Sequence, residues 1–301
     1  MKELNIGMVG MDTSHSRIYA SLLNHVSHPL HVPGGRLTCG YAGGSADFPL
    51  SASRVEAISR ELQEHYGVEL VSSIAEVAER ADAVLLTSVD GRVHREQFAV
   101  LAPYGKPVFI DKPLAVTSAD ARAIMELAAS CGTPVFSSSM VRFGYPLNEA
   151  LKDESAGSIV GADCCGPLEL QPTQPGFFWY GIHTAEMLYA ALGGGCISVR
   201  AQSNEVQEWA VGQWSDGRIG TLRGNVTGGS DFTAVLHRER GSTAVNALGR
   251  HYEAGHQNLL RQFLLMAGGA LPPVSPAVTL ELIRFIEAAN ESRETGQTVL
   301  L

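Results

Sequence analysis

Residues 105–115 of the chain read Gly-Lys-Pro-Val-Phe-Ile-Asp-Lys-Pro-Leu-Ala. An apolar run typical of a buried parallel strand ends here on Asp111, and Lys112 and Pro113 follow it. In open α/β sheets ligands bind at the carboxyl ends of the strands, so we expect Lys112 to open onto a ligand crevice. There a lysine whose pKa is lowered by desolvation or by a neighbouring cation can transfer protons, whereas an ordinary surface lysine is the alternative interpretation.

The sequence around this stretch alternates short β-branched runs with helical segments from residue 4 to about 140, a pattern typical of βαβ units and a parallel sheet. Strands are predicted at 4–9, 36–42, 68–71, 83–87, 107–110 and 134–138. Helices are predicted at 14–26, 51–66, 73–80, 94–104 and 118–129. We therefore expect a doubly wound Rossmann domain over residues 1–140 that binds a dinucleotide.

The pattern changes after Met140 to alternating strands punctuated by glycine. Strands are predicted at 159–165, 199–204, 206–214, 217–224 and 232–238, and helices at 181–192, 253–266 and 276–293. This texture predicts an α+β domain with a mostly antiparallel open sheet over residues 141–301, which we expect to bind the substrate and to support oligomerisation.

Composition limits the classes of function. The 301 residues carry a formal net charge of −9 with no basic run, which disfavours nucleic acid and anionic membranes as partners and favours a small molecule. No apolar run approaches the ~20 residues of a transmembrane helix, and the first apolar strand is too short for a secretory signal, so we expect a cytoplasmic protein. The five cysteines show no metal-ligand spacing, and we expect reduced thiols.

The first strand-to-helix turn reads Gly10-Met11-Asp12-Thr13-Ser14-His15. It stands where a dinucleotide fingerprint places its pyrophosphate, at a helix N-terminus. A G-x-G-x-x-G motif counted from Gly10 would have glycine at positions 12 and 15, where this chain has Asp12 and His15. An aspartate there adds a Cβ and a like charge, which predicts altered or weakened cofactor binding.

The second strand also lacks the expected acid for the cofactor ribose, because Gly43 and Gly44 stand at its end. Asp47 is one candidate substitute, while Ser53 and Arg54 are candidates for binding a 2′-phosphate. Helix capping or solvation is the alternative role for these residues, so the sequence leaves NAD and NADP open.

His183 lies at the start of the predicted helix 181–192. The positive potential of a helix N-terminus favours the neutral form of a histidine, which suits a base or an oriented hydrogen-bond partner. A histidine satisfied at a domain junction is the alternative. A metal site formed by Asp12, His15 and His183 is a third hypothesis, although two ligands at one helix start fall short of a ligand set.

Four stretches in order resemble the glucose-fructose oxidoreductase / inositol dehydrogenase / MocA family. Residues 105–115 match its strand ending in Glu-Lys-Pro, here with Asp111 for the glutamate, and 133–146 resemble its next strand and Arg-Phe-x-x-Pro entry to the second domain. Residues 181–186 resemble its Gly-x-His-x-x-Asp helix, and 286–299 resemble its last helix and strand. The resemblance implies an NAD(P)-dependent oxidoreductase that transfers hydride between a nicotinamide and a sugar, polyol or related hydroxy or keto compound.

The resemblance also implies roles for individual residues. Lys112 would be the general acid/base, and His183 would orient the substrate or share the proton. The cofactor would contact Gly10, Met11, Asp12, Ser14, His15, Thr87, Ser88, His94, Asp111, Lys112 and Pro113. The substrate would contact Lys112, Arg142, Trp179, Tyr180 and His183. Members of the family are often dimers or tetramers, and no resident metal is expected.

One departure from the family pattern concerns the substrate side. Family dehydrogenases commonly carry an aspartate four residues before the helix histidine, where this chain has Trp179, an aromatic surface on which a sugar ring can stack. With Asp12 and His15 in the phosphate turn, this departure supports an alternative function. The chain would then be a non-redox relative, an NAD-assisted glycosidase or a ligand-sensing regulator, with altered or lost cofactor binding.

Overall fold

The computed structural model describes residues 3–249 and 252–301. The chain forms two compact units. The first comprises residues up to Ala115 together with Ala119–Ser137 and His256–Ser275, and the second comprises Val116–Ser118, Ser138–Gly255 and Pro276–Leu301. The chain thus returns to the first unit after residue 255.

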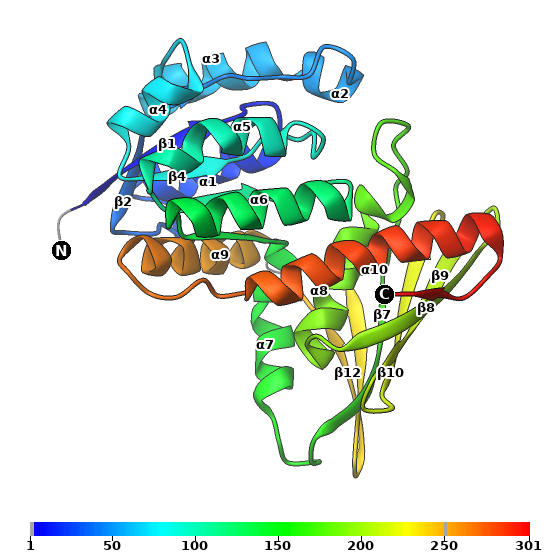
Figure 1. Ribbon diagram of the computed structural model, residues 1–301. Helices are drawn as coiled ribbons and strands as arrows, with labels where there is room; N and C mark the ends of the chain where they lie inside the picture. Colours follow the sequence, from blue (N-terminus) through cyan, green and yellow to red (C-terminus); the bar gives the residue numbers. More distant parts are fainter. Residues whose placement is uncertain (1–2, 250–251) are drawn as a thin grey trace. The chain divides into compact units, whose positions relative to one another are not determined.

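The first unit contains a six-stranded parallel sheet in the order β3-β2-β1-β4-β5-β6. Figure 1 labels its strands β1, β2 and β4. Its strands are β1 (Leu4–Val9), β2 (Gly35–Tyr41), β3 (Glu69–Leu70), β4 (Ala83–Leu86), β5 (Val108–Asp111) and β6 (Val135–Ser138). The order reverses between β1 and β4, as in a dinucleotide-binding fold. All four residues of β4 and of β5 are buried, as expected for strands covered on both faces. The predicted doubly wound sheet is confirmed.

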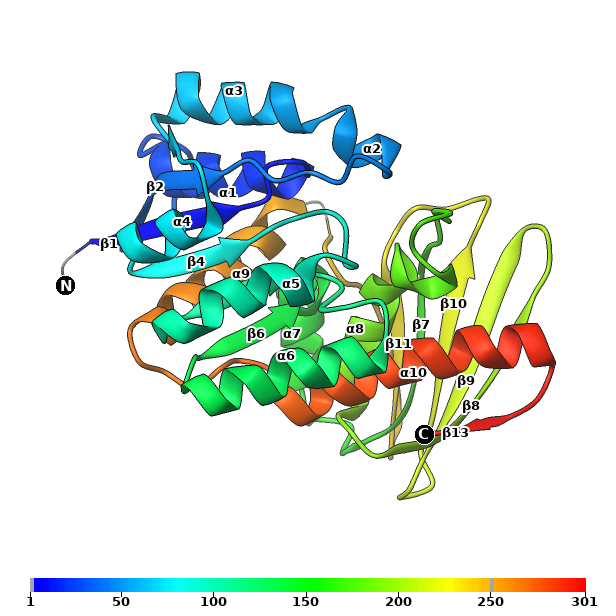
Figure 2. The same ribbon diagram turned by 45° about the horizontal axis from the view of Figure 1, so that its top comes forward.

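Helices surround this sheet (Figure 2). They are α1 (Ser14–Asn24), α2 (Pro49–Ala52), α3 (Val55–Tyr66), α4 (Ile74–Arg80), α5 (His94–Leu101), α6 (Ser118–Cys131) and α9 (Tyr252–Ala267), whose residues from His256 onward belong to this unit. The single helix predicted over 51–66 is wrong, because Pro49 starts a short helix at its first position and a second begins after Arg54. The helix predicted over 94–104 ends at Leu101, and a 3-10 turn containing Pro103 follows.

The second unit contains a seven-stranded sheet in the order β12-β11-β7-β10-β9-β8-β13. Its strands are β7 (Ile159–Pro167), β8 (Cys196–Ser203), β9 (Gln207–Trp214), β10 (Ile219–Asn225), β11 (Thr233–Arg238), β12 (Gly241–Asn246) and β13 (Val299–Leu300). The sheet is mostly antiparallel, as predicted, but β7 and β10 pair in parallel. The prediction from residue patterns missed β12, whose burial alternates weakly.

Two helices, α8 (Gly181–Leu192) and α10 (Pro276–Thr295), pack on this sheet (Figure 2). Burial alternates along β9 and β10, and glycines on the covered face admit helix side chains. A Cβ on Gly212 would meet Phe285 of α10 at 2.8 Å, and one on Gly220 would meet Leu188 of α8 at 2.7 Å. A further helix, α7 (Tyr145–Lys152), was not predicted.

Two expectations about the whole chain can be compared with the structure. The five cysteines are free thiols, as expected. Across 3–249 and 252–301, every helix is too short or too polar to span a bilayer.

Candidate functional site

Strand register brings three loops of the first unit to one edge of its sheet. Val9 of β1 lies opposite Leu86 of β4, and Leu86 lies opposite Ile110 of β5. The residues that follow, Gly10, Thr87 and Asp111, therefore meet at the carboxyl ends of the strands, where doubly wound folds bind their ligands. Most of the residues predicted to contact a cofactor stand in these three loops.

The turn after β1 requires glycine. Gly10 has φ +87°, and a Cβ on it would lie 2.3 Å from both the backbone nitrogen and Oγ of Ser88. The Thr87 hydroxyl donates to the Gly10 carbonyl at 2.5 Å, which fixes the turn against β4. A Cβ on Gly43, after β2, would lie 3.3 Å from the Gly10 Cα. Three strand ends thus approach one another closely, and Thr87 supports the turn from within because its side chain is fully buried.

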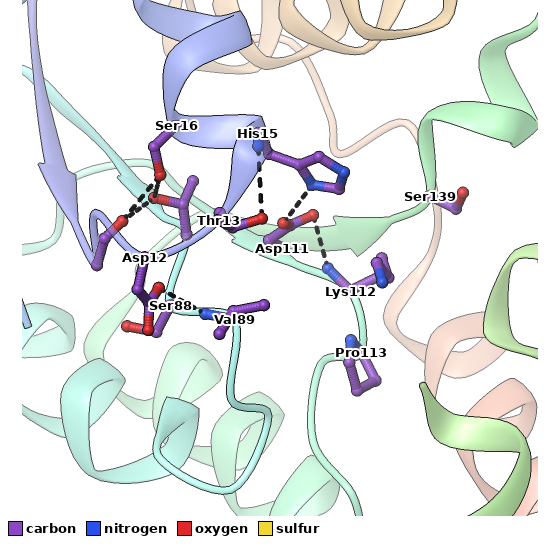
Figure 3. Close-up of polar contacts among 12 residues, drawn as sticks. Asp12, Thr13, His15, Ser16, Ser88, Val89, Asp111, Lys112, Pro113 and Ser139 are labelled. Carbon is purple, nitrogen blue, oxygen red and sulfur yellow. Dashed lines mark hydrogen bonds and ion pairs between the residues drawn. The ribbon is translucent and has the colours of Figure 1, made fainter. Parts of the chain in front are cut away.

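The Asp12 carboxylate is turned into the protein. It accepts from the Val89 amide at 2.9 Å (Figure 3). It also accepts from the Ser51 hydroxyl at 2.5 Å, and Asp12 is fully buried. Burial raises the pKa of this carboxyl, although the bonds from Ser51 and Val89 act in the opposite direction. The carboxylate therefore joins the β1 turn to α2 and to the loop after β4, and its charge is taken up by protein donors.

Replacement of Asp12 by the glycine of the dinucleotide fingerprint is expected to lower the free energy of unfolding. It is not expected to raise the affinity for the nicotinamide dinucleotide that the resemblance implies. Asp12→Gly leaves the Ser51 hydroxyl and the Val89 amide without their acceptor, at a cost of about 3 kcal/mol in the free energy of unfolding. Its affinity for NADH should stay within about threefold of the parent's. Urea denaturation and NADH titration measure both quantities. A much tighter binding by Asp12→Gly would instead show that the carboxylate repels the cofactor.

His15 and Asp111 form a buried pair beneath the lysine loop. The His15 Nδ1 lies 2.6 Å from Asp111 Oδ2, while Asp111 Oδ1 accepts from the backbone amide of Lys112 at 2.9 Å (Figure 3). Burial alone would raise the pKa of Asp111, but the charges of His15 and Lys112 and the bonds they donate hold it below its ordinary value. Asp111 therefore contacts the protein on both of its oxygens.

This lowered pKa gives a pH dependence with a definite sign. Because the folded pKa of Asp111 lies below the unfolded one, ionised Asp111 stabilises the fold above about pH 4, and this contribution is lost as the pH falls through the folded pKa. The difference in free energy of unfolding between the parent and Asp111→Asn should be largest near neutral pH and shrink under acidic conditions. Urea titrations over a pH series measure it, and a constant difference at every pH would contradict the assignment.

His94 connects the loop after β4 to the lysine loop. Its Nε2 lies 2.8 Å from the Ser88 carbonyl and its Nδ1 lies 2.9 Å from the Pro113 carbonyl, and the ring is fully buried. The peptide between Lys112 and Pro113 is cis. The ring of His94 thus contacts backbone carbonyls, so this predicted cofactor residue lies behind the loops that it holds together.

Two of the residues after β2 that were candidates for binding the cofactor ribose or a 2′-phosphate, Asp47 and Ser53, bond other residues of the protein. Asp47 forms a two-pronged pair with Arg92, at 2.9 Å for each contact, and Arg92 also pairs with the buried Asp90. The pattern did not single out Asp90 and Arg92, because an acid and an arginine two residues apart in a loop resemble a solvated surface. Ser53 and Arg54 lie between α2 and α3, where Ser53 bonds the Leu50 carbonyl. The Asp47 side chain is exposed, but its carboxylate is paired with Arg92.

A second polar cluster lies within the second unit. His183, at the start of α8, has its Nδ1 2.6 Å from the Ser139 hydroxyl, and Glu186 one turn later accepts the Ser139 amide at 3.1 Å. Arg142 pairs with the other oxygen of Glu186. Sequence reasoning named His183 and Arg142 but not Ser139 and did not pair Glu186 with Arg142. The sequence offered no signal for Ser139, because it ends a serine run after a strand.

The predicted aromatic residues flank this histidine. The rings of Tyr180 and Phe232 lie 5.3 and 5.4 Å from the His183 ring, both in edge contact. Trp179 is largely buried and lies beside Tyr180, with ring centroids 6.4 Å apart. His183 therefore has a hydroxyl partner and aromatic walls within its own unit.

The members of the hypothetical metal site each have another partner. Asp12 bonds Ser51 and Val89, His15 pairs with Asp111, and His183 pairs with Ser139 in the other unit. Within the part of the chain that the structure describes, no group of three or more potential ligands gathers. The idea that Asp12 and His15 share a metal is corrected accordingly.

The chain is similar to one protein family model and to several solved structures. Residues 4–138 match the model of an oxidoreductase family with an NAD-binding Rossmann fold. No curated protein matches the sequence. Among solved structures, a probable dehydrogenase from Thermotoga maritima has a TM-score of 0.82 at 20% identity, with 99% of both chains covered.

Two further structures are similar over nearly their whole length. A myo-inositol 2-dehydrogenase from Lactobacillus plantarum has a TM-score of 0.82 at 15% identity, with 100% of each chain covered. An oxidoreductase from Agrobacterium radiobacter, solved with NAD+, L-tartaric acid and magnesium, has a TM-score of 0.78 at 15% identity and covers 99% of this chain and 98% of its own. At these identities the likeness establishes the fold.

Proposed function

Because residues 4–138 match the model of the Gfo/Idh/MocA oxidoreductase family, we propose that the protein is an NAD(P)-dependent oxidoreductase acting on a sugar, polyol or related hydroxy or keto compound. The observation that carries the proposal is the glycine turn after β1, which stands at the same sheet edge as the loop of Lys112. The first unit would bind the dinucleotide, and the second would bind the substrate.

The residues of the first unit fit a nicotinamide dinucleotide. Gly10 lets the turn after β1 approach Ser88, because a Cβ there would collide with it, and the buried Ser88 Oγ lacks a hydrogen-bond partner among the described residues. The acid that argued against a pyrophosphate at this turn is directed inward to Ser51 and Val89. The N-terminus of α1, at Ser14, follows directly and attracts negative charge.

A groove beside β2 suits the adenosine end of such a cofactor. It has a volume of about 410 Å³ and begins at Ala42 and Gly43, next to the glycine turn. Val55 and Leu70 give it apolar walls, and its polar lining consists of Glu56, Ser59, Arg60 and Gln63. Its volume is in the range of small-molecule sites. We propose that it receives the adenosine half, with NAD or NADP still to be distinguished.

Lys112 is the proposed general acid/base. When bound, a nicotinamide dinucleotide accepts a hydride from a CH–OH carbon or returns one to a carbonyl carbon. The neutral amine of Lys112 would take the hydroxyl proton in oxidation, and its ammonium form would return a proton to the carbonyl oxygen in reduction. Lys112 is half-buried at the end of a rigid, buried strand, which limits the positions that its amine can reach.

The second unit would orient the substrate. We propose that His183 donates to or accepts from a substrate hydroxyl, while Ser139 fixes the orientation of its ring at Nδ1. Arg142, Trp179 and Tyr180 would contact the same substrate, with Arg142 held by Glu186. Aromatic rings beside a polar cluster suit a sugar or cyclic polyol, which presents apolar CH faces and hydroxyl edges.

Turnover assays with a panel of polyols and aldoses test this proposal. The expected result is formation of reduced nicotinamide, followed by absorbance, with NAD+ or NADP+ and at least one polyol. Substrate turnover without net change in the reduced nicotinamide would favour an NAD-assisted glycosidase. Tight binding of a sugar without any turnover would favour a ligand-sensing regulator.

We also propose that the chain forms a homo-oligomer through the face of the seven-stranded sheet that α8 and α10 leave uncovered. Trp209, on β9, is 37% exposed on this face. Size-exclusion chromatography with light scattering is expected to give a multiple of the 32.1 kDa chain mass. A Trp209→Lys variant should shift the mass towards one chain, and a parent that elutes as a single chain would contradict the proposal.

A further inference from the structure

Two departures from the family pattern are in contact with each other. The resemblance expects glycine at position 15 and glutamate at position 111, where this chain has histidine and aspartate. The two side chains meet at 2.6 Å, between His15 Nδ1 and Asp111 Oδ2. A glycine at position 15 has no side chain that could reach Asp111. The pair is therefore a feature of this chain that the fold alone does not require.

The pair is buried directly beside the proposed acid/base. Asp111 is 3% exposed and His15 is 8% exposed, and Asp111 also accepts the backbone amide of Lys112. A carboxylate removed from water in this way is costly unless a cation or several donors compensate it. His15 and Lys112 are the cations whose charge acts on Asp111. Without His15, more of the compensation would fall on the charge of Lys112.

His256 and Tyr19 are the aromatic neighbours that the structure describes beside His15. His256 is fully buried, and its ring lies 4.7 Å from the His15 ring in edge contact. Burial, and after it the charge of His15, hold the pKa of His256 well below its ordinary value, so this ring is neutral near pH 7. Tyr19 closes the cluster, 6.1 Å from His15 and 5.5 Å from His256 between ring centroids.

We propose that His15 is a positioning and charge-balancing residue for Lys112: it pairs with the buried Asp111 carboxylate and so makes loss of a proton from the Lys112 amine easier. The inference rests on the proposed role of Lys112 as general acid/base. A proton-transfer lysine must reach its neutral form near the working pH. An unbalanced carboxylate on the neighbouring residue would favour the ammonium form of Lys112 by about one pH unit.

Competitive acetylation of the full-length protein over a pH series measures this effect without cofactor or substrate. Acetic anhydride modifies the neutral amine, and peptide mass spectrometry gives the labelling midpoint of Lys112. Lys152, whose side chain is 72% exposed, is the internal reference. In His15→Gln the Lys112 midpoint should rise by about one pH unit, while that of Lys152 stays unchanged.

Two further variants complete the test. Asp111→Asn removes the negative charge and should lower the Lys112 midpoint. The double variant, His15→Gln with Asp111→Asn, should return the midpoint close to the parent's. An unchanged midpoint in His15→Gln, or a double variant that matches His15→Gln, would overturn the inference. If His15→Gln does not fold, an unshifted midpoint in Asp111→Asn overturns it equally.

The readout separates this inference from the proposed function. If the protein binds no dinucleotide but shows the shifted Lys112 midpoints, the proposed function is wrong and the role of His15 is supported. If the protein turns over substrate but the Lys112 midpoint does not shift, only the role of His15 is wrong. Where turnover is measurable, the pH profile of kcat/KM should move with the labelling midpoint, which a merely structural role of His15 would not cause.

Discussion

Gly10→Ala is expected to abolish tight binding of NADH, with a loss of affinity of about a hundredfold or more. The added Cβ would lie 2.3 Å from the Ser88 backbone nitrogen, and Gly10 has φ +87°, which L side chains rarely adopt. The turn must therefore move away from β4, and the site for the pyrophosphate moves with it. We expect a loss of about 3 kcal/mol in the free energy of unfolding as well. Quenching of protein fluorescence by NADH and urea denaturation measure the two effects.

Gly67→Ala is the matched control. Gly67 follows α3 with φ +67°, but no atom lies within 4 Å of the position that a Cβ would take. It shares a positive φ with Gly10 but has no close neighbour, so we expect a cost of about 1 kcal/mol in the free energy of unfolding and an unchanged affinity for NADH. Equal losses of affinity in the two variants would show that general destabilisation, and not the shape of the turn, weakens binding.

Lys112→Ala is expected to lower kcat by about 10²- to 10⁴-fold while the affinity for NADH stays within about threefold of the parent's. The loss follows because the substrate hydroxyl would lack the group that takes its proton. Steady-state turnover on the best polyol of the panel, together with NADH titration, separates chemistry from cofactor binding. Lys112→Arg should be equally inactive, because a guanidinium keeps its proton at working pH.

Lys152→Ala serves as the control for this variant. Lys152 lies at the end of α7 in the second unit, pairs with Glu149 and is largely exposed, so its removal should leave kcat unchanged. A Lys112→Ala enzyme that retains the parent's kcat would remove Lys112 from the chemistry and leave it as a surface residue at a strand exit.

Residue patterns were sufficient to predict the parallel sheet and the edge of the sheet at which ligands bind. The β-branched run of β5 and the acid at its end are local signals, and the sheet order follows from alternating strands and helices. The glycine at position 10 was also predictable, since a tight turn after the first strand needs positive φ. These features depend on neighbours in sequence, which is why a single sequence shows them.

Features that depend on distant partners were not predictable. The direction of the Asp12 carboxylate is set by Ser51 and Val89, which are 39 and 77 residues away. Similarly, Ser139 and His183 meet across 44 residues. No local sequence pattern predicts that His256–Ser275 belong to the first unit, because an amphipathic helix can cover either sheet. Such placements come from packing of the whole chain.

Native mass spectrometry of the folded parent protein with NADH and with NADPH tests most directly whether the first unit binds a nicotinamide dinucleotide. The account predicts one dinucleotide per chain with at least one of the two, retained in Gly67→Ala and lost in Gly10→Ala. A folded parent that binds neither dinucleotide at concentrations up to about 1 mM would contradict it.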